Sequence, residues 1–140
     1  MNIVITSFGH LHGPIPDGAH IVVDLRFHFR DPHWDTRLRP LTAYDRRVIR
    51  AVRRTPGIRR LVRATARQAN AYAHGPSATQ HELLIVVGCA GGRHRAGVAA
   101  YLLARRLRRR GHHVRLHHRD LHRPVVHRTA GPAKPETCGG

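Results

Sequence analysis

An apolar run that leads directly into a glycine-rich turn constrains the fold of this chain more than any other feature. Residues Leu83 to Val87 are all apolar, residues 88–97 read GCAGGRHRAG, and a helical pattern follows as far as Arg110. A short apolar run bounded by glycines is typical of a buried strand, and the later apolar spacing predicts a helix. The turn between them exposes free backbone N–H groups at the positive end of the helix dipole. Such a position favours binding of an anion.

The remaining pattern extends this unit into one domain. Strands are expected at 2–8, 20–25, 82–87 and 113–118, and helices at 45–54, 57–73 and 95–110. Strand, turn, helix and strand form a βαβ unit, so the strands are expected to be parallel with a right-handed crossover. The sequence predicts an α/β fold: a small, mostly parallel sheet flanked by helices in a single three-layer-like domain over residues 1–128. The Pro- and Gly-containing tail, 129–140, is predicted to be disordered.

The charge is extreme. Of 140 residues, 25 are basic and 8 acidic, which gives a net charge of +17. Such a surface attracts nucleic acid, phosphorylated metabolites or an acidic partner. The arginines of 105–110 and of 46–63 form either solvated helix surfaces or a phosphate-binding face. Few aromatic residues lie among them, so RNA recognition would be of shape and backbone.

Compartment and cofactors follow from what the sequence lacks. Cys89 and Cys138 do not suggest a disulfide framework, no signal peptide is expected, and no apolar run approaches the ~20 residues of a membrane span. We expect a cytoplasmic protein with no membrane partner. The fourteen histidines form no recognised ligand spacing, so neither a metal nor a cofactor is expected.

The turn itself carries reactive side chains. Gly91 and Gly92 allow close approach of a ligand to the backbone, and Arg93, His94 and Arg95 favour an anion. Arg95 is the preferred phosphate clamp, because a guanidinium binds two oxygens at once.

The spacing of Cys89 and Arg95, C-x5-R, is that of cysteine-dependent phosphatases, in which a thiolate attacks phosphorus. The helix N-terminus would stabilise such a thiolate, whereas the alternative is a small buried residue that closes the strand. Ala96 and Gly88 replace the hydroxyl residue and the histidine usual in those enzymes. Spacing does not choose a general acid among Asp31, Asp35 and Asp120.

Over nearly the whole globular part, the chain resembles the C-terminal domain of the RNase adapter (RapZ) family. The motifs that carry the resemblance are Phe8-Gly9, His12-Gly13, Asp24, Arg26-Phe27, Pro32-His33-Trp34-Asp35, Leu38-Arg39-Pro40-Leu41-Thr42, Asp45, Gly88-Cys89, Gly91-Gly92, His94-Arg95 and His118-Arg119.

The resemblance implies an α/β module that senses glucosamine-6-phosphate, binds small RNA and presents it to a ribonuclease. It places the sugar-phosphate pocket at His12, Asp24, Arg26, His33, Cys89, Ala90, Gly91, Gly92, Arg93, His94 and Arg95, and RNA contacts at Arg119, Arg123 and Arg128. The family oligomerises, which makes a homo-oligomer an expectation here. Ala90 and Ala96 stand where the family has hydroxyl residues, and no Walker-type nucleotide loop occurs.

The leading hypothesis is therefore a non-enzymatic sensor or adapter domain that binds a phosphorylated small molecule. A Cys89-dependent phosphatase and a plain RNA-binding module are the alternatives.

Overall fold

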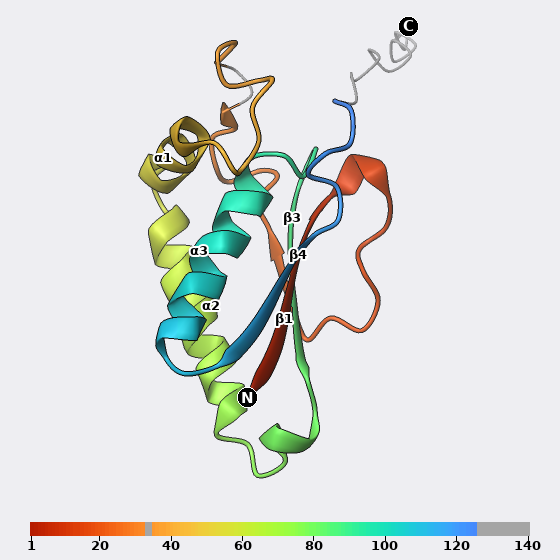
Figure 1. The fold of residues 1–140 in the computed structure, drawn as a ribbon, viewed down its shortest axis with the longest axis vertical. Coiled ribbons are helices and arrows are strands. Elements are labelled where there is room, and N and C mark those ends of the chain that lie inside the picture. The colour runs from red at the N-terminus through yellow and green to blue at the C-terminus, as the bar shows by residue number, and fades with distance from the viewer. Residues whose placement is uncertain (33–34, 126–140) are drawn as a thin grey trace, which may run out of the picture.

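The computed structural model describes residues 1–32 and 35–125 and confirms a single α/β domain (Figure 1). The elements in chain order are β1 (Asn2–Gly9), η1 (His10–His12), β2 (Ile21–Asp24), α1 (Arg46–Arg54), α2 (Ile58–Ala73), η3 (Ala78–Gln80), β3 (Leu83–Cys89), α3 (Arg95–Arg109) and β4 (His113–His118). The four strands form one sheet in the order β2-β3-β1-β4, and every pair is parallel. The predicted disorder of 129–140, together with His33 and Arg128, lies outside the described residues.

The strand order explains the layers. From β2 to β3 and from β3 to β4 the chain moves in one direction along the sheet, whereas from β1 to β2 it moves in the other. Because parallel crossovers are right-handed, connections that run in opposite directions lie on opposite faces. Figure 1 shows this arrangement: the helices cover one face, and the segment between β1 and β2 runs along the other. The third layer is thus an irregular segment, not a helix.

Local sequence sets the element boundaries. Asp45 and Thr42 compete as the cap of α1, and Asp45 takes that place because its carboxylate accepts the Arg47 amide at 2.8 Å. The strand β3 runs two residues beyond its predicted end and includes Gly88 and Cys89. Gly88 acts here as a strand residue without a side chain, since a Cβ would lie 2.4 Å from the Phe8 ring.

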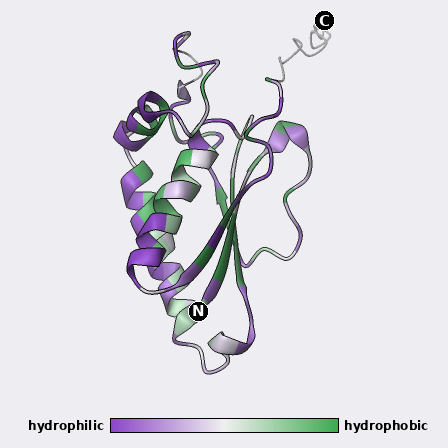
Figure 2. Ribbon diagram, viewed as in Figure 1, coloured by the Kyte–Doolittle hydropathy of each residue, from purple (hydrophilic) through white to green (hydrophobic). Residues whose placement is uncertain are grey.

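The core lies between the sheet and the three helices, and α3 contributes the most buried residues. The central strands β1 and β3 are buried over most of their length, and Figure 2 shows that hydrophobic residues predominate along them. One face of α3 presents alanines, which let the helix approach the sheet closely: Ala96, Ala99, Ala100 and Ala104. Burial alternates along the edge strand β4, so this strand has one face in contact with the core and one in water. No helix in the described part of the chain is long and apolar enough to cross a membrane.

The end of β1 meets the turn after β3 backbone to backbone. A Cβ on Gly9 would lie 2.5 Å from the Gly91 carbonyl carbon, so only glycine fits there. Gly92 has a φ of +75° and also lies against Gly9. Gly91 has open space around its Cβ position and needs no positive φ. The contact therefore constrains Gly9 and Gly92, whereas Gly91 is sterically free.

The variant Gly9→Ala should lower the free energy of unfolding by about 1–3 kcal/mol, because its methyl group would overlap the Gly91 backbone. Gly91→Ala is the matched control and should change the free energy of unfolding by less than about 0.5 kcal/mol. Urea denaturation followed by circular dichroism measures both. Equal stability of Gly9→Ala and wild type would contradict this close contact.

Candidate functional site

The chemistry-bearing side chains gather at the carboxyl edge of the sheet, at the top of Figure 1. Since all strands are parallel, η1 after β1, Asp24 at the end of β2 and Cys89 at the end of β3 share this edge. Asp24 lies in register with Gly88, so the structure brings Asp24, Arg26 and Cys89 together. Ligands of open parallel sheets bind at such edges.

The first cluster at this edge is His10 with Asp24 and Arg26. Arg26 forks onto the Asp24 carboxylate through Nε at 3.1 Å and Nη2 at 2.8 Å, and these bonds lower the pKa of Asp24 to about 2. The His10 Nε2 atom lies 3.8 Å from Asp24 Oδ1 and directly over Gly88, where a Cβ would be 2.7 Å away. Burial, aided by Arg26, lowers the pKa of His10, so its imidazole is neutral at pH 7.

Several polar donors and acceptors at the edge are unpartnered. The Nε2 atoms of His10 and His12 are both buried and form no hydrogen bond within the described residues. In the same part of the chain, the amides of Ala90, Gly91 and Arg93 donate no hydrogen bond. The helix α3 begins at His94 without a side-chain cap. Unpaired polar groups concentrated at one edge are typical of a place where a polar ligand is held.

The three residues that end the turn reach across the fold to the long segment between β2 and α1. Arg93 donates to the carbonyls of Pro40 and Arg123, and the imidazole of His94 contacts the Leu41 carbonyl at 2.8 Å. Each of these bonds holds part of an irregular segment in place.

Arg95 makes the strongest of these cross-links. Its Nη1 donates to the carbonyls of Leu25, Arg26 and Phe29 at 2.8–3.1 Å, and its Nη2 to Asp31 at 3.1 Å. Only 4% of Arg95 is exposed. Its guanidinium is therefore enclosed within the protein and braces residues 25–31. The prediction that Arg95 is a phosphate clamp does not match this geometry.

Cys89 is equally enclosed. The thiol is 3% exposed, and its sulfur accepts the Gly92 amide at 3.2 Å. Burial raises the pKa of the Cys89 thiol, and nearby amides and Arg95 offset this only in part. Cys89 is thus a neutral thiol at pH 7. Of the two interpretations, burial of the thiol favours the small buried residue over the stabilised thiolate.

The candidate general acids are also engaged. Asp31 pairs with Arg95, Asp35 with Arg37, and the fully buried Asp120 with Arg119 and Arg123. A buried thiol, a buried guanidinium and paired carboxylates do not form the nucleophile, clamp and acid of a cysteine-dependent phosphatase.

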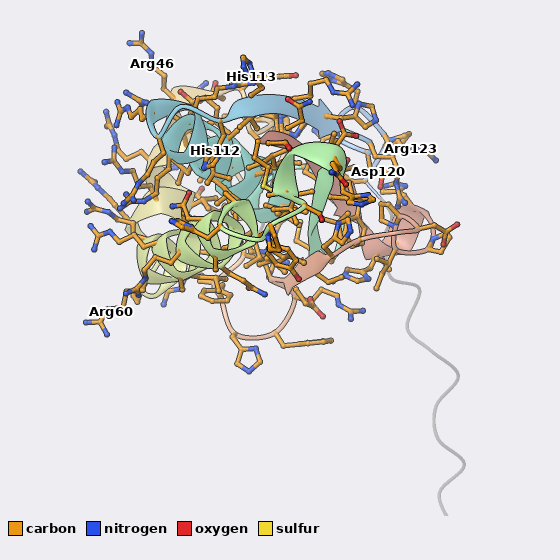
Figure 3. The ribbon with its side chains drawn as sticks, turned by 90° about the horizontal axis from the view of Figure 1, so that it is seen from below. Arg46, Arg60, His112, His113, Asp120 and Arg123 are labelled. Carbon is orange, nitrogen blue, oxygen red and sulfur yellow. The ribbon has the colours of Figure 1, made fainter. Side chains whose placement is uncertain are left out.

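Asp120 links the strand ends. Its Oδ2 accepts the Gly9 amide at 2.8 Å and the Arg119 Nε at 2.9 Å, while Arg123 lies 3.0 Å from Oδ1 (Figure 3). Arg119 also donates to the Pro14 carbonyl and stacks over Phe8. Two of the residues predicted to contact RNA, Arg119 and Arg123, are therefore tied into the fold. The third, Arg128, lies outside the described residues.

Sequence reasoning missed His10 and Asp120 as parts of this edge. The signal for His10 was Gly88, because a glycine inside an apolar strand indicates close approach of another group. Asp120 was considered only as an acid, although an aspartate directly after a predicted edge strand is placed to bind backbone amides. Among the described residues, no group of three or more His, Cys, Asp or Glu could hold a metal ion.

Fold and edge together define a small parallel α/β domain with its polar groups at the carboxyl ends of its strands. The chain belongs to the RapZ C-terminal domain family, whose profile matches residues 1–122. A protein of Rhodospirillum centenum named a nucleotide-binding protein is 41% identical over 139 residues, which cover 96% of this chain and 40% of that protein. The RNase adapter protein RapZ of Yersinia enterocolitica is 36% identical over 122 residues, which cover 86% of this chain and 42% of that protein. The chain thus spans about two fifths of the length of these curated relatives.

Alkylation tests the state of Cys89. In the variant Cys138→Ser, iodoacetamide at pH 7 should leave Cys89 unmodified in the folded protein, because its thiol is buried and neutral. Complete modification is expected after unfolding in urea. Peptide mass spectrometry measures both, and rapid alkylation of the folded protein would contradict a buried neutral thiol.

Proposed function

We propose that this domain binds a phosphorylated small molecule, an amino-sugar phosphate such as glucosamine-6-phosphate, at the carboxyl edge of its sheet. Binding there signals to a ribonuclease and its RNA, so the domain acts as a sensor and adapter. The observation that carries the proposal is the set of unpartnered polar groups at the same edge of the sheet as Asp24: two buried histidine nitrogens and three turn amides.

The turn suits the phosphate. Three free amides in the turn that leads into the uncapped start of α3 present donors to an anion, and the helix dipole adds to their field. The buried Nε2 atoms of His10 and His12 contribute further polar groups. Arg95 supports the phosphate end of the site indirectly, because its hydrogen bonds hold residues 25–31 in place.

Asp24 suits the amine. Its carboxylate is ionised at neutral pH, and its side chain is about one-third exposed, so a ligand ammonium can reach it. Arg26 occupies one side of the carboxylate, which leaves lone pairs on the other side for the ligand. The site thus has a carboxylate at one end and anion-binding amides at the other. These two ends suit a small molecule that carries both an amine and a phosphate.

The adapter role is supported by family membership and by the name of the Yersinia relatives, RNase adapter protein. A ribonuclease is the protein partner proposed on that basis. Ala90 and Ala96 remove two hydroxyl donors relative to the family motif, so the affinity for the phosphate should be lower than with hydroxyl residues.

Ligand preference tests the proposal. Thermal unfolding with glucosamine-6-phosphate, glucose-6-phosphate and inorganic phosphate should show the largest stabilisation with the amino sugar, about 2.7 kcal/mol at ~100 times its dissociation constant. Asp24→Asn should abolish the preference for the amino sugar over glucose-6-phosphate, because the ligand ammonium loses its carboxylate. Arg26→Gln is the matched control and should keep that preference.

Equal, weak stabilisation by all three anions, unchanged in Asp24→Asn, would contradict the proposed site. It would indicate general attraction of anions by a basic protein.

A further inference from the structure

A continuous arginine groove crosses the helical side of the molecule, away from the carboxyl edge. It consists of two adjoining hollows of about 770 and 520 Å³, between α1 and α2 and between α2 and the end of α3. Eleven arginines line them, and Arg53, Arg59 and Arg63 line both. Figure 3 shows two members of this arginine groove, Arg46 and Arg60, reaching outward from the helices.

The groove has no internal counter-charge. No aspartate or glutamate occurs from Arg46 to His81 or from Leu83 to Arg119. In the structure of residues 1–32 and 35–125, none of the eleven guanidiniums forms an ion pair or hydrogen bond. This contrasts with Arg119 and Arg123, which both form ion pairs with Asp120.

Helix electrostatics explain only part of the arrangement. The arginines at the end of α3 complement the negative end of its dipole, but Arg46, Arg59 and Arg60 lie at the positive ends of α1 and α2. The start of α2, at Gly57, has no side-chain cap and itself lines the groove. Arginines four residues apart, such as Arg59 and Arg63, also repel each other. The positive charge in the groove therefore opposes folding unless an external anion neutralises it.

The shape and composition select the kind of anion. The groove spans three helices, which is far longer than a single phosphate, and guanidiniums bind phosphate oxygens in pairs. No aromatic side chain lines it, so it offers no stacking for unpaired bases. The large exposed apolar side chains of the described chain, including Phe27 and Tyr44, lie elsewhere, so nothing at the groove would insert into a lipid layer.

We infer that the arginine groove binds the phosphodiester backbone of double-stranded nucleic acid, through charge and shape and not through base identity. This inference deepens the RNA-binding part of the proposed function and moves the contact from the Arg119–Arg123 side of the sheet to the helices. The groove and the sugar-phosphate site are separate, because no residue of one belongs to the other.

Salt-dependent binding of a labelled 20-base-pair RNA duplex, measured by fluorescence anisotropy, tests the groove. The variant Arg53→Gln/Arg59→Gln/Arg63→Gln should weaken binding at 0.15 M salt by at least about tenfold and should reduce the slope of log K against log salt by about 3. The variant Arg47→Gln/Arg67→Gln/Arg115→Gln removes the same charge from exposed positions outside the groove and should weaken binding by less than about threefold. The groove variant should melt at or above the wild-type temperature, because its substitutions relieve repulsion. The control loses the surface ion pairs of Arg47 with Asp45 and of Arg115 with Glu82, which contribute little, so it should melt close to the wild-type temperature.

Equal weakening in both triple variants, or no binding of the duplex by wild type, would overturn the inference. So would tighter binding of the matched single strand, of phosphatidylserine vesicles or of polyglutamate, which would indicate stacking, a membrane or an acidic partner. A DNA duplex run in parallel shows whether the A-form RNA helix or any duplex is preferred, and binding of either supports the groove. Sugar-phosphate binding in the groove variant should equal that of wild type, so failure of the edge site is detected separately.

Discussion

The buried guanidinium of Arg95 is the interaction on which the rest of the site depends. The described residues between β2 and α1 form no strand or long helix, so their carbonyls need donors from elsewhere. Arg95 supplies donors to three of them and an ion pair to Asp31, while Arg93 and His94 bond to Pro40 and Leu41. Three consecutive side chains thus hold the segment between β2 and α1 against the turn that follows β3.

The inward direction of Arg95 distinguishes two functions that the C-x5-R spacing allows, phosphatase catalysis and ligand binding. A cysteine-dependent phosphatase needs the arginine of C-x5-R in the open site and the cysteine as a thiolate. Here the arginine donates inward and the pKa of the Cys89 thiol is raised, so the same spacing builds a scaffold for turn amides and histidines. In the proposed function a ligand binds at this edge, with Asp24 at the acidic end of the site and the start of α3 at its electropositive end. Away from this edge, positive charge is concentrated in the arginine groove. Within the described residues, the arginines of the groove form no ion pair.

Much of the fold follows from sequence because its signals are local. The strand predicted at 113–118 matches the bounds of β4, and the helix predicted from residue 45 begins at Arg46 in the structure. Asp24 and Cys89 lie close together because β2 and β3 are both parallel and adjacent, and only the parallel direction follows from the predicted βαβ pattern. The direction of Arg95 could not be predicted, because it depends on carbonyls about 65–70 residues away in a segment without periodicity. The end of β3 was misplaced for a similar reason: Gly88 was treated as a turn signal, whereas it makes room for Phe8 and His10.

The most direct test of this account is hydrogen exchange of residues 25–41 in Arg95→Lys. Lysine keeps the charge but lacks the planar fork that reaches several carbonyls at once, so the amides of Leu38 and Leu41 should exchange about tenfold faster or more. Arg108→Lys is the control on the same helix, since Arg108 bonds only to the Val114 carbonyl at the surface. Unchanged protection of residues 25–41 in Arg95→Lys, or the same loss in both variants, would contradict the central role of Arg95.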